Sequence, residues 1–75
     1  MYYKYKEEYQ MFVTVDTIII DVLRTDMRTA DIFAEAGLHC MGWSGAAFES
    51  IGDAAAVHGI SAETLVDRLN AYFGN

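Results

Sequence analysis

The residues with the clearest chemical potential lie in the stretch HCMGWSG at residues 39–45, which contains the chain's only cysteine, Cys40. A C-x-x-C pair serves redox chemistry because its two thiols can close a small disulfide ring. Trp43 occupies the position of the second cysteine, so an intrachain dithiol cannot form. A single thiol can still be glutathionylated, form a mixed disulfide or contribute to a soft metal site completed by other residues.

The reactivity of Cys40 depends on its thiolate fraction. The start of a helix expected at residues 51–58 would lower the pKa of the thiol, whereas the acidic surface would raise it. The alternative role is structural, because a free cysteine commonly packs as a small hydrophobic residue. Both roles stay open at this point.

Two histidines are the other candidates. His39 adjoins Cys40, but a hydrolytic pair also needs an orienting group and an oxyanion site, and no motif supplies them. His58 falls at the end of the helix expected at 51–58, on its apolar stripe, which favours a core histidine over a metal ligand shared with Cys40 and His39. The sequence therefore predicts no catalytic residue, no metal motif and no cofactor, and favours a non-enzymatic protein.

The loop that carries Cys40 spans residues 38–48 and consists largely of small residues. Its other candidate site residues are Met41, Gly42, Trp43 and Ser44. A tryptophan in such a loop either fills a hole in the core or forms an exposed apolar patch that binds a partner. Both alternatives are compatible with the sequence.

An all-α bundle of about four short helices, preceded by a short extended segment at 12–15, is expected to position this loop. Cap residues and glycines predict helices at 18–25, 27–36 and 51–58, and a last helix after Ser61. The expected caps are Asp16 or Thr17, then Asp26, Ser50 and Ser61, and the expected helix ends are Gly37 and Gly59. The inward faces are predicted to comprise Ile18, Val22 and Leu23, then Ile32, Phe33 and Ala36, then Ile51, Ala54, Ala55 and His58, and finally Leu65, Val66, Leu69, Tyr72 and Phe73.

Composition limits the number of domains and the kinds of partner that the chain can have. The chain has 75 residues, a hydrophobic content of 53% and a net charge of −6, which indicate one small globular domain at 11–75. The acidic balance argues against nucleic-acid and membrane partners. One cysteine and no apolar leader fit a cytoplasmic protein. Residues 1–10 contain four tyrosines and form either a tail or an aromatic arm that packs on a second subunit.

Four stretches, TIIIDVL, RTADIFAEAGLHCMG, ESIGDAAAVHGI and LVDRLNAYF, together resemble a small bacterial family, the hybrid-cluster-protein-associated redox disulfide domains. The resemblance covers about residues 12–73. It implies a compact helical domain of the kind common in anaerobic bacteria, found alone or beside redox-related domains. The family pattern usually reads C-x-G-C-P, which Cys40 and Gly42 match and Trp43 and Ser44 do not. Only Cys40 can therefore inherit a thiol role.

Three functions follow as alternatives. The first is an accessory domain that contacts an unknown, redox-related protein partner or a ligand through Cys40. The second is a protein-interaction or self-association module that uses the loop 38–48, as a homodimer or with another protein. The third is a metal or cluster site shared between subunits through Cys40.

Overall fold

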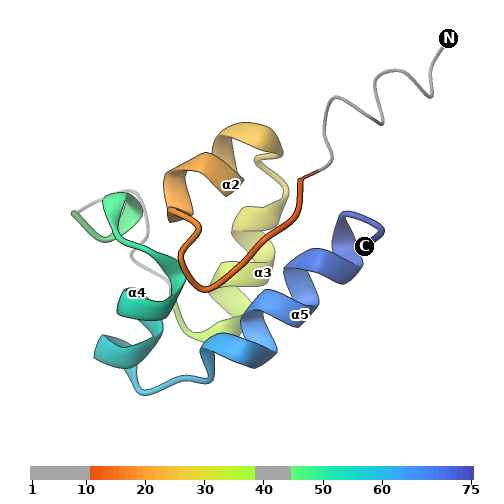
Figure 1. The fold of residues 1–75 in the computed structure, drawn as a ribbon. Helices are drawn as coiled ribbons and strands as arrows, with labels where there is room; N and C mark the ends of the chain where they lie inside the picture. The colour runs from red at the N-terminus through yellow and green to blue at the C-terminus, as the bar shows by residue number, and fades with distance from the viewer. Residues whose placement is uncertain (1–10, 39–44) are drawn as a thin grey trace, which may run out of the picture.

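The structure is a computed structural model and describes residues 11–38 and 45–75. Its elements in chain order are α2 (Ile19–Thr25), α3 (Thr29–Ala36), the 3-10 helix η1 (Gly45–Phe48), α4 (Ile51–His58) and α5 (Ala62–Tyr72). The β contact recorded in these segments is an isolated antiparallel bridge between Ile18 and Ser50. The predicted all-α bundle of four short helices is confirmed (Figure 1).

Local sequence signals set most of the helix ends. The Ser50 hydroxyl accepts a hydrogen bond from the Asp53 N–H at 3.0 Å, and Ser61 accepts one from Thr64 at 3.1 Å, as the cap prediction requires. Gly37 and Gly59 both adopt left-handed backbone conformations, with φ of 111° and 68°. These two residues let α3 and α4 end in tight turns that a Cβ-bearing residue would strain.

The predicted cap of α2 is wrong, although the helix begins within one residue of its predicted start. Neither Asp16 nor Thr17 caps it; the Thr17 hydroxyl instead accepts from the Thr14 N–H at 2.9 Å. The helix follows Ile18, whose side chain cannot cap, and the Ile19 N–H donates to the Glu49 carbonyl at 3.0 Å. A contact with a distant segment therefore satisfies an N–H group that a local side chain was expected to satisfy.

The start of α3 also differs from its prediction. The helix begins at Thr29 rather than at residue 27, and no side chain caps it. The Asp26 carbonyl accepts from the Thr29 N–H at 3.0 Å and from the Thr29 hydroxyl at 2.7 Å. Asp26 thus forms a turn before the helix, and Thr29 is fully buried because its hydroxyl is satisfied within that turn.

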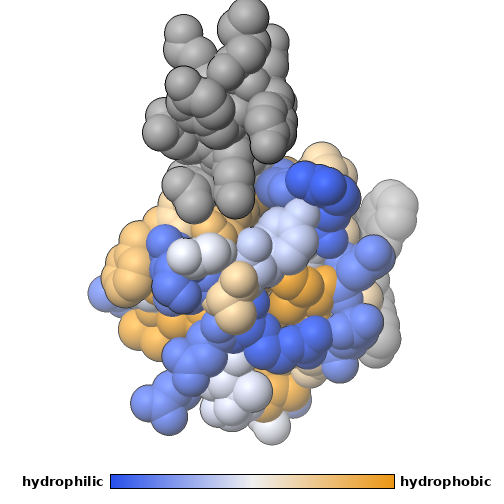
Figure 2. Space-filling view, turned by 90° about the vertical axis from the view of Figure 1, so that its right-hand side faces the viewer, coloured by the Kyte–Doolittle hydropathy of each residue, from blue (hydrophilic) through white to orange (hydrophobic). Residues whose placement is uncertain are grey.

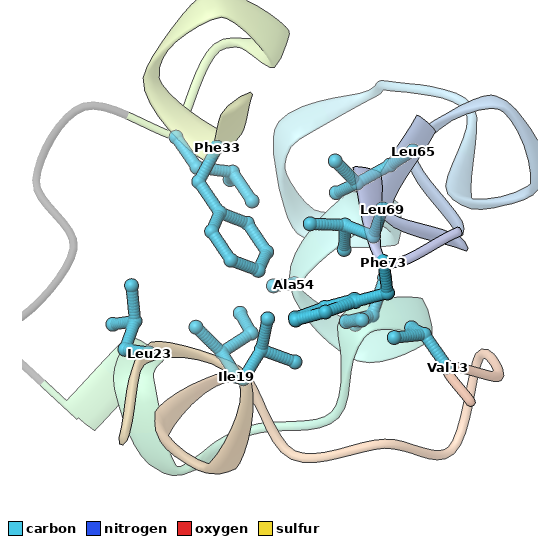
Figure 3. Packing of buried hydrophobic residues seen from close by; sticks show 11 residues of the cluster. Val13, Ile19, Leu23, Phe33, Ala54, Leu65, Leu69 and Phe73 are labelled. Carbon is cyan, nitrogen blue, oxygen red and sulfur yellow. The ribbon is translucent and has the colours of Figure 1, made fainter. Parts of the chain in front are cut away.

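The hydrophobic core forms where the four helices meet (Figure 3). The ring of Phe33 points from α3 into the centre of the cluster, toward Ile19 of α2 and Ala54 of α4. Leu65 and Leu69 of α5 close the opposite side. Each fully buried side chain of this size contributes about 1.5–3 kcal/mol relative to exposure, so these few residues dominate the stability of so small a bundle.

Two residues predicted to face the core are exposed, namely His58 and Tyr72. His58 is the last residue of α4, and Gly59 turns the chain away directly after it. Tyr72 is the last residue of α5, and its hydroxyl reaches a polar partner, Asp26, instead of the core. Four others predicted to be inward are half-buried at the core edge, namely Ile18, Ile32, Ala36 and Val66.

Residues 11–18, called here the strap, lie across the bundle between the end of α5 and the start of α4 (Figure 1). The Ile51 N–H donates to the Thr17 carbonyl at 2.9 Å, and the Gly52 N–H donates to the Val15 carbonyl at 2.8 Å. A Cβ at Gly52 would lie 3.2 Å from the Val15 carbonyl oxygen. The close approach of strap and helix therefore favours a glycine at this position.

The other end of the strap is held by two asparagines near the C-terminus. The side-chain amide of Asn70 accepts from the Val13 N–H at 2.8 Å and donates to the Val13 carbonyl at 2.9 Å, as a neighbouring β-strand would. Asn75 donates to the Met11 carbonyl at 2.6 Å. These bonds allow Val13 to be buried without leaving its backbone polar groups unsatisfied.

The outer surface mixes polar and apolar side chains. Figure 2 shows the side of the molecule at which α5 ends, where hydrophilic residues cover much of the face and hydrophobic ones are visible between them. Among the helices of residues 11–38 and 45–75, none combines the length and apolar character needed to cross a membrane.

We expect Asn70→Ala to lower the free energy of unfolding by about 2 kcal/mol, because it leaves both polar groups of Val13 without partners. Urea unfolding followed by circular dichroism measures this loss. The matched control is Asn75→Ala, which removes two exposed bonds, to the Met11 carbonyl and to the Asn70 amide oxygen, and should cost clearly less because it leaves both bonds to Val13 in place. An equal or smaller loss in the Asn70 variant would contradict the role given to the amide pair.

Candidate functional site

The loop 38–48 leaves and rejoins the bundle at two fixed points. On the first side, Leu38 is buried and its N–H donates to the Phe33 carbonyl at 2.9 Å. On the other side, η1 packs against α2 and buries Ala47. Both ends of the loop are thus tied to the same core.

The predicted site residues between these points lie outside the described residues. They are His39, Cys40, Met41, Gly42, Trp43 and Ser44. The tyrosine-rich segment 1–10 also lies outside them. The roles assigned to these residues therefore stay predictions from the sequence.

His58 is the one predicted site residue that the structure places. It is exposed in the last turn of α4, so the prediction of a core histidine is wrong. A positive charge there would interact favourably with the helix dipole. No group of three or more metal-ligating side chains gathers anywhere in residues 11–38 and 45–75.

The first turn of α4 follows the loop closely in sequence, but its N–H groups are already bonded within the chain. Those of Ile51 and Gly52 donate to strap carbonyls, and that of Asp53 donates to the Ser50 hydroxyl at 3.0 Å. These groups therefore offer no hydrogen bond to a thiolate in the loop. The influence of α4 on such a thiolate is limited to its dipole.

Phe48 is the most distinctive described side chain of the loop. It ends η1 and is 69% exposed, although the preceding residue, Ala47, is buried. Aromatic residues contribute strongly to protein interfaces when a partner covers them. The end of the loop thus presents an apolar ring on a short helix that is packed against the core.

An open groove lies between the end of α3 and the start of α5. Its lining is mainly aliphatic, with Arg68 at one edge held by an ion pair to Glu35 of α3. The lining residues are Ala36, Ile60, Ser61, Thr64, Leu65 and Arg68. None of its polar residues is buried, so the groove lacks the fixed polar groups that orient a ligand in most small-molecule sites.

A cluster of titratable side chains joins the turn before α3 to the end of α5. The Arg28 guanidinium donates to both Asp26 carboxylate oxygens, at 3.0 and 2.8 Å, and the Tyr72 hydroxyl donates to the same carboxylate at 2.8 Å. The guanidinium also lies 6.0 Å from the centre of the Tyr72 ring. This cluster links parts of the chain 46 residues apart.

The hydrogen bonds from Arg28 hold the pKa of Asp26 well below its usual range, and the bond from Tyr72 acts in the same direction. Burial and the neighbouring carboxylate raise the pKa of Tyr72. Both shifts favour the charged carboxylate beside a neutral phenol. The cluster is therefore suited to stabilising the fold rather than to exchanging protons near neutral pH.

The sequence predicted Asp26 as a helix cap, whereas its side chain is only 8% exposed and pairs with Arg28. The close spacing of Asp26 and Arg28 was the local signal, since such a pair can close a turn. Tyr72 carried no comparable signal, because its contact depends on how α5 packs beside α3.

Comparison with known protein families gives one match. Residues 13–66 are similar to the family described as a domain of unknown function, DUF1858. The match includes the strap from Val13 onward, the loop 38–48 and all of α4. No curated protein and no solved structure matches the chain.

We expect Asp26→Asn to lower the free energy of unfolding at pH 7 by about 1 kcal/mol, because it removes the charge from the bonds to Arg28 and Tyr72. Since the folded pKa of Asp26 is depressed, its contribution is complete above the unfolded carboxyl pKa of about 3.9. This contribution to stability is lost as the pH falls from about 3.9 toward the lower pKa that Asp26 has in the folded protein. The difference between parent and variant should therefore shrink below pH 4.

Urea unfolding at several pH values measures this difference. Asp31→Asn is the matched control, because Asp31 is exposed and also near the start of α3. A stability difference between parent and Asp26→Asn that stays constant down to pH 2 would contradict the assignment.

Proposed function

The chain belongs to the DUF1858 family, a domain of unknown function, and on that premise we propose that it is an accessory domain acting through the loop 38–48. In this proposal the helices form a frame, and Cys40 is a single-thiol contact for a redox-related partner or ligand. Residues 11–75 act as one non-enzymatic domain, in a cytoplasmic setting in which the thiol stays reduced.

The observation that carries the proposal is the anchoring of the loop at both ends. Leu38 and Ala47 are 4% and 2% exposed, so the loop leaves and returns through core contacts. A segment held in this way loses less conformational entropy on binding than a free one. Cys40 belongs to this segment in the sequence, and the resemblance to redox disulfide domains supports a thiol role for it.

The proposed chemistry is thiol–disulfide exchange with a disulfide of the partner. The Cys40 thiolate attacks one sulfur of that disulfide, a new intermolecular disulfide forms, and the other sulfur leaves as a thiolate. No further oxidant is needed, because the partner disulfide supplies it. Since Trp43 stands where a resolving cysteine would be, release requires a thiol from another molecule.

A second candidate function is supported by Phe48. Its exposed ring at the end of η1 favours an interaction module in which the loop binds another protein or a second copy without using the thiol. The first candidate function requires the Cys40 thiol and the second does not, so substitution of Cys40 can distinguish them.

We expect Cys40 in the folded protein to react with a small aromatic disulfide near neutral pH, because the proposal requires an accessible thiol. Release of the aromatic thiol against pH measures the reaction, and Cys40→Ser is the blank. Size measurement with and without reductant detects an intermolecular disulfide. A Cys40 thiol that reacts only after unfolding would contradict the proposed thiol–disulfide exchange.

For the interaction module, we expect Trp43 to emit at long wavelength and to be quenched by iodide in the free protein. Fluorescence of the native chain measures both properties, because Trp43 is its only tryptophan. Cys40→Ser should leave this signal and partner binding unchanged. Blue-shifted emission that resists quenching would show that Trp43 is not part of an exposed binding surface.

A further inference from the structure

We propose that a surface beside the loop 38–48 binds a lysine- and arginine-rich segment of a partner protein. This inference rests on the proposed function, because it names the chemistry of the partner that the loop would meet. The surface, called here the acidic face, is formed by Val15, Asp16, Phe48, Glu49 and Asp53.

Backbone hydrogen bonds bring the two halves of the acidic face together. The bond from the Gly52 N–H to the Val15 carbonyl places Val15 and Asp16 beside the first turn of α4, where Asp53 lies. The bond from the Ile19 N–H to the Glu49 carbonyl places Glu49, and Phe48 before it, beside the start of α2. In Figure 1 the bend of the strap and the start of α4 lie side by side, with η1 next to them.

The acidic face includes two exposed apolar residues. Phe48 is 69% exposed at the η1 end, and Val15 is 45% exposed at the strap end. Three exposed carboxylates, those of Asp16, Glu49 and Asp53, accompany them. Apolar contacts flanked by charges are a usual arrangement in interfaces, where the apolar groups supply affinity and the charges supply orientation.

The charge of the face is uncompensated by its own segments. Residues 11–18 and 45–53, which build it, contain no lysine or arginine. Arg28 and Arg68 form ion pairs on other elements, with Asp26 and Glu35. Arg24 lies in the last turn of α2, whereas Glu49 lies beside the first residue of that helix. The net charge of −6 adds to the local field, so a basic segment would be attracted and correctly oriented.

The same negative charges disfavour other kinds of binding partner at the acidic face. Two copies of the acidic face brought together would place carboxylates against carboxylates, which is unfavourable. Nucleic acids and anionic lipids would be repelled for the same reason. A basic partner segment that also carries apolar side chains fits both features of the face.

A random library of 12-residue peptides displayed on phage tests the proposal directly. The bait is the full chain carrying Cys40→Ser, so a failure of the thiol chemistry cannot affect the result. We expect the selected peptides to contain more lysine and arginine than aspartate and glutamate, together with aromatic or aliphatic residues. Failure to select any binder, or selection of peptides without this basic excess, would overturn the proposal.

Two variants locate the binding. One variant replaces Asp16, Glu49 and Asp53 by their amides, and the other is Phe48→Ala. Each should lower the affinity for the selected peptides about tenfold. The matched control replaces three exposed carboxylates of α3 and α5 by amides, namely Asp31, Glu63 and Asp67. The control changes the net charge by the same amount. An equal loss of peptide binding in the control would show that overall charge explains the effect, and would contradict binding at the acidic face.

Discussion

The hydrogen bonds between the strap and the first turn of α4 are the constraint on which the rest of the structure depends. They satisfy N–H groups of Ile51 and Gly52 that no helix can satisfy internally. They also fix the start of α2, because the strap continues directly into that helix and the Ile19 N–H bonds to Glu49. One short contact thus sets the relation of α2, α4 and η1, and with it the position at which the loop rejoins the core.

This arrangement separates the parts of the molecule that carry stability from those available for recognition. The polar side chains with close partners, such as Asp26, Asn70 and Ser50, are engaged in holding segments together. Phe48 and the carboxylates around the strap bend face outward. A small domain with this division is suited to presenting a loop, and the family match covers the loop and the frame as far as the first turn of α5.

Much of the fold followed from local residue signals. Ser50 and Ser61 cap helices, and Gly37 and Gly59 end them, because each acts through its own neighbours in the chain. The spacing of apolar residues also identified Phe33 and Leu69 as core. Such features require no knowledge of how the helices are arranged.

The remaining features depend on contacts between distant segments. The cap expected at Asp16 or Thr17 is replaced by a carbonyl from Glu49, and Tyr72 turns toward Asp26 instead of the core. His58 fitted the helical period of α4 but lies where the helix ends. The loop and its thiol stay predictions from the sequence. The sequence left open whether Phe48 belongs to an exposed apolar patch, and its exposure followed only from the structure, in which η1 buries Ala47 and exposes the ring.

Native-state hydrogen exchange of the strap contacts tests the central claim most directly. If the strap and α4 form the frame of the domain, the amides of Ile19, Ile51 and Gly52 should exchange as slowly as that of Leu69 in the buried face of α5. All of them should then exchange only through global unfolding. Exchange of these three amides much faster than that of Leu69 would show that the strap opens independently, and would contradict the account.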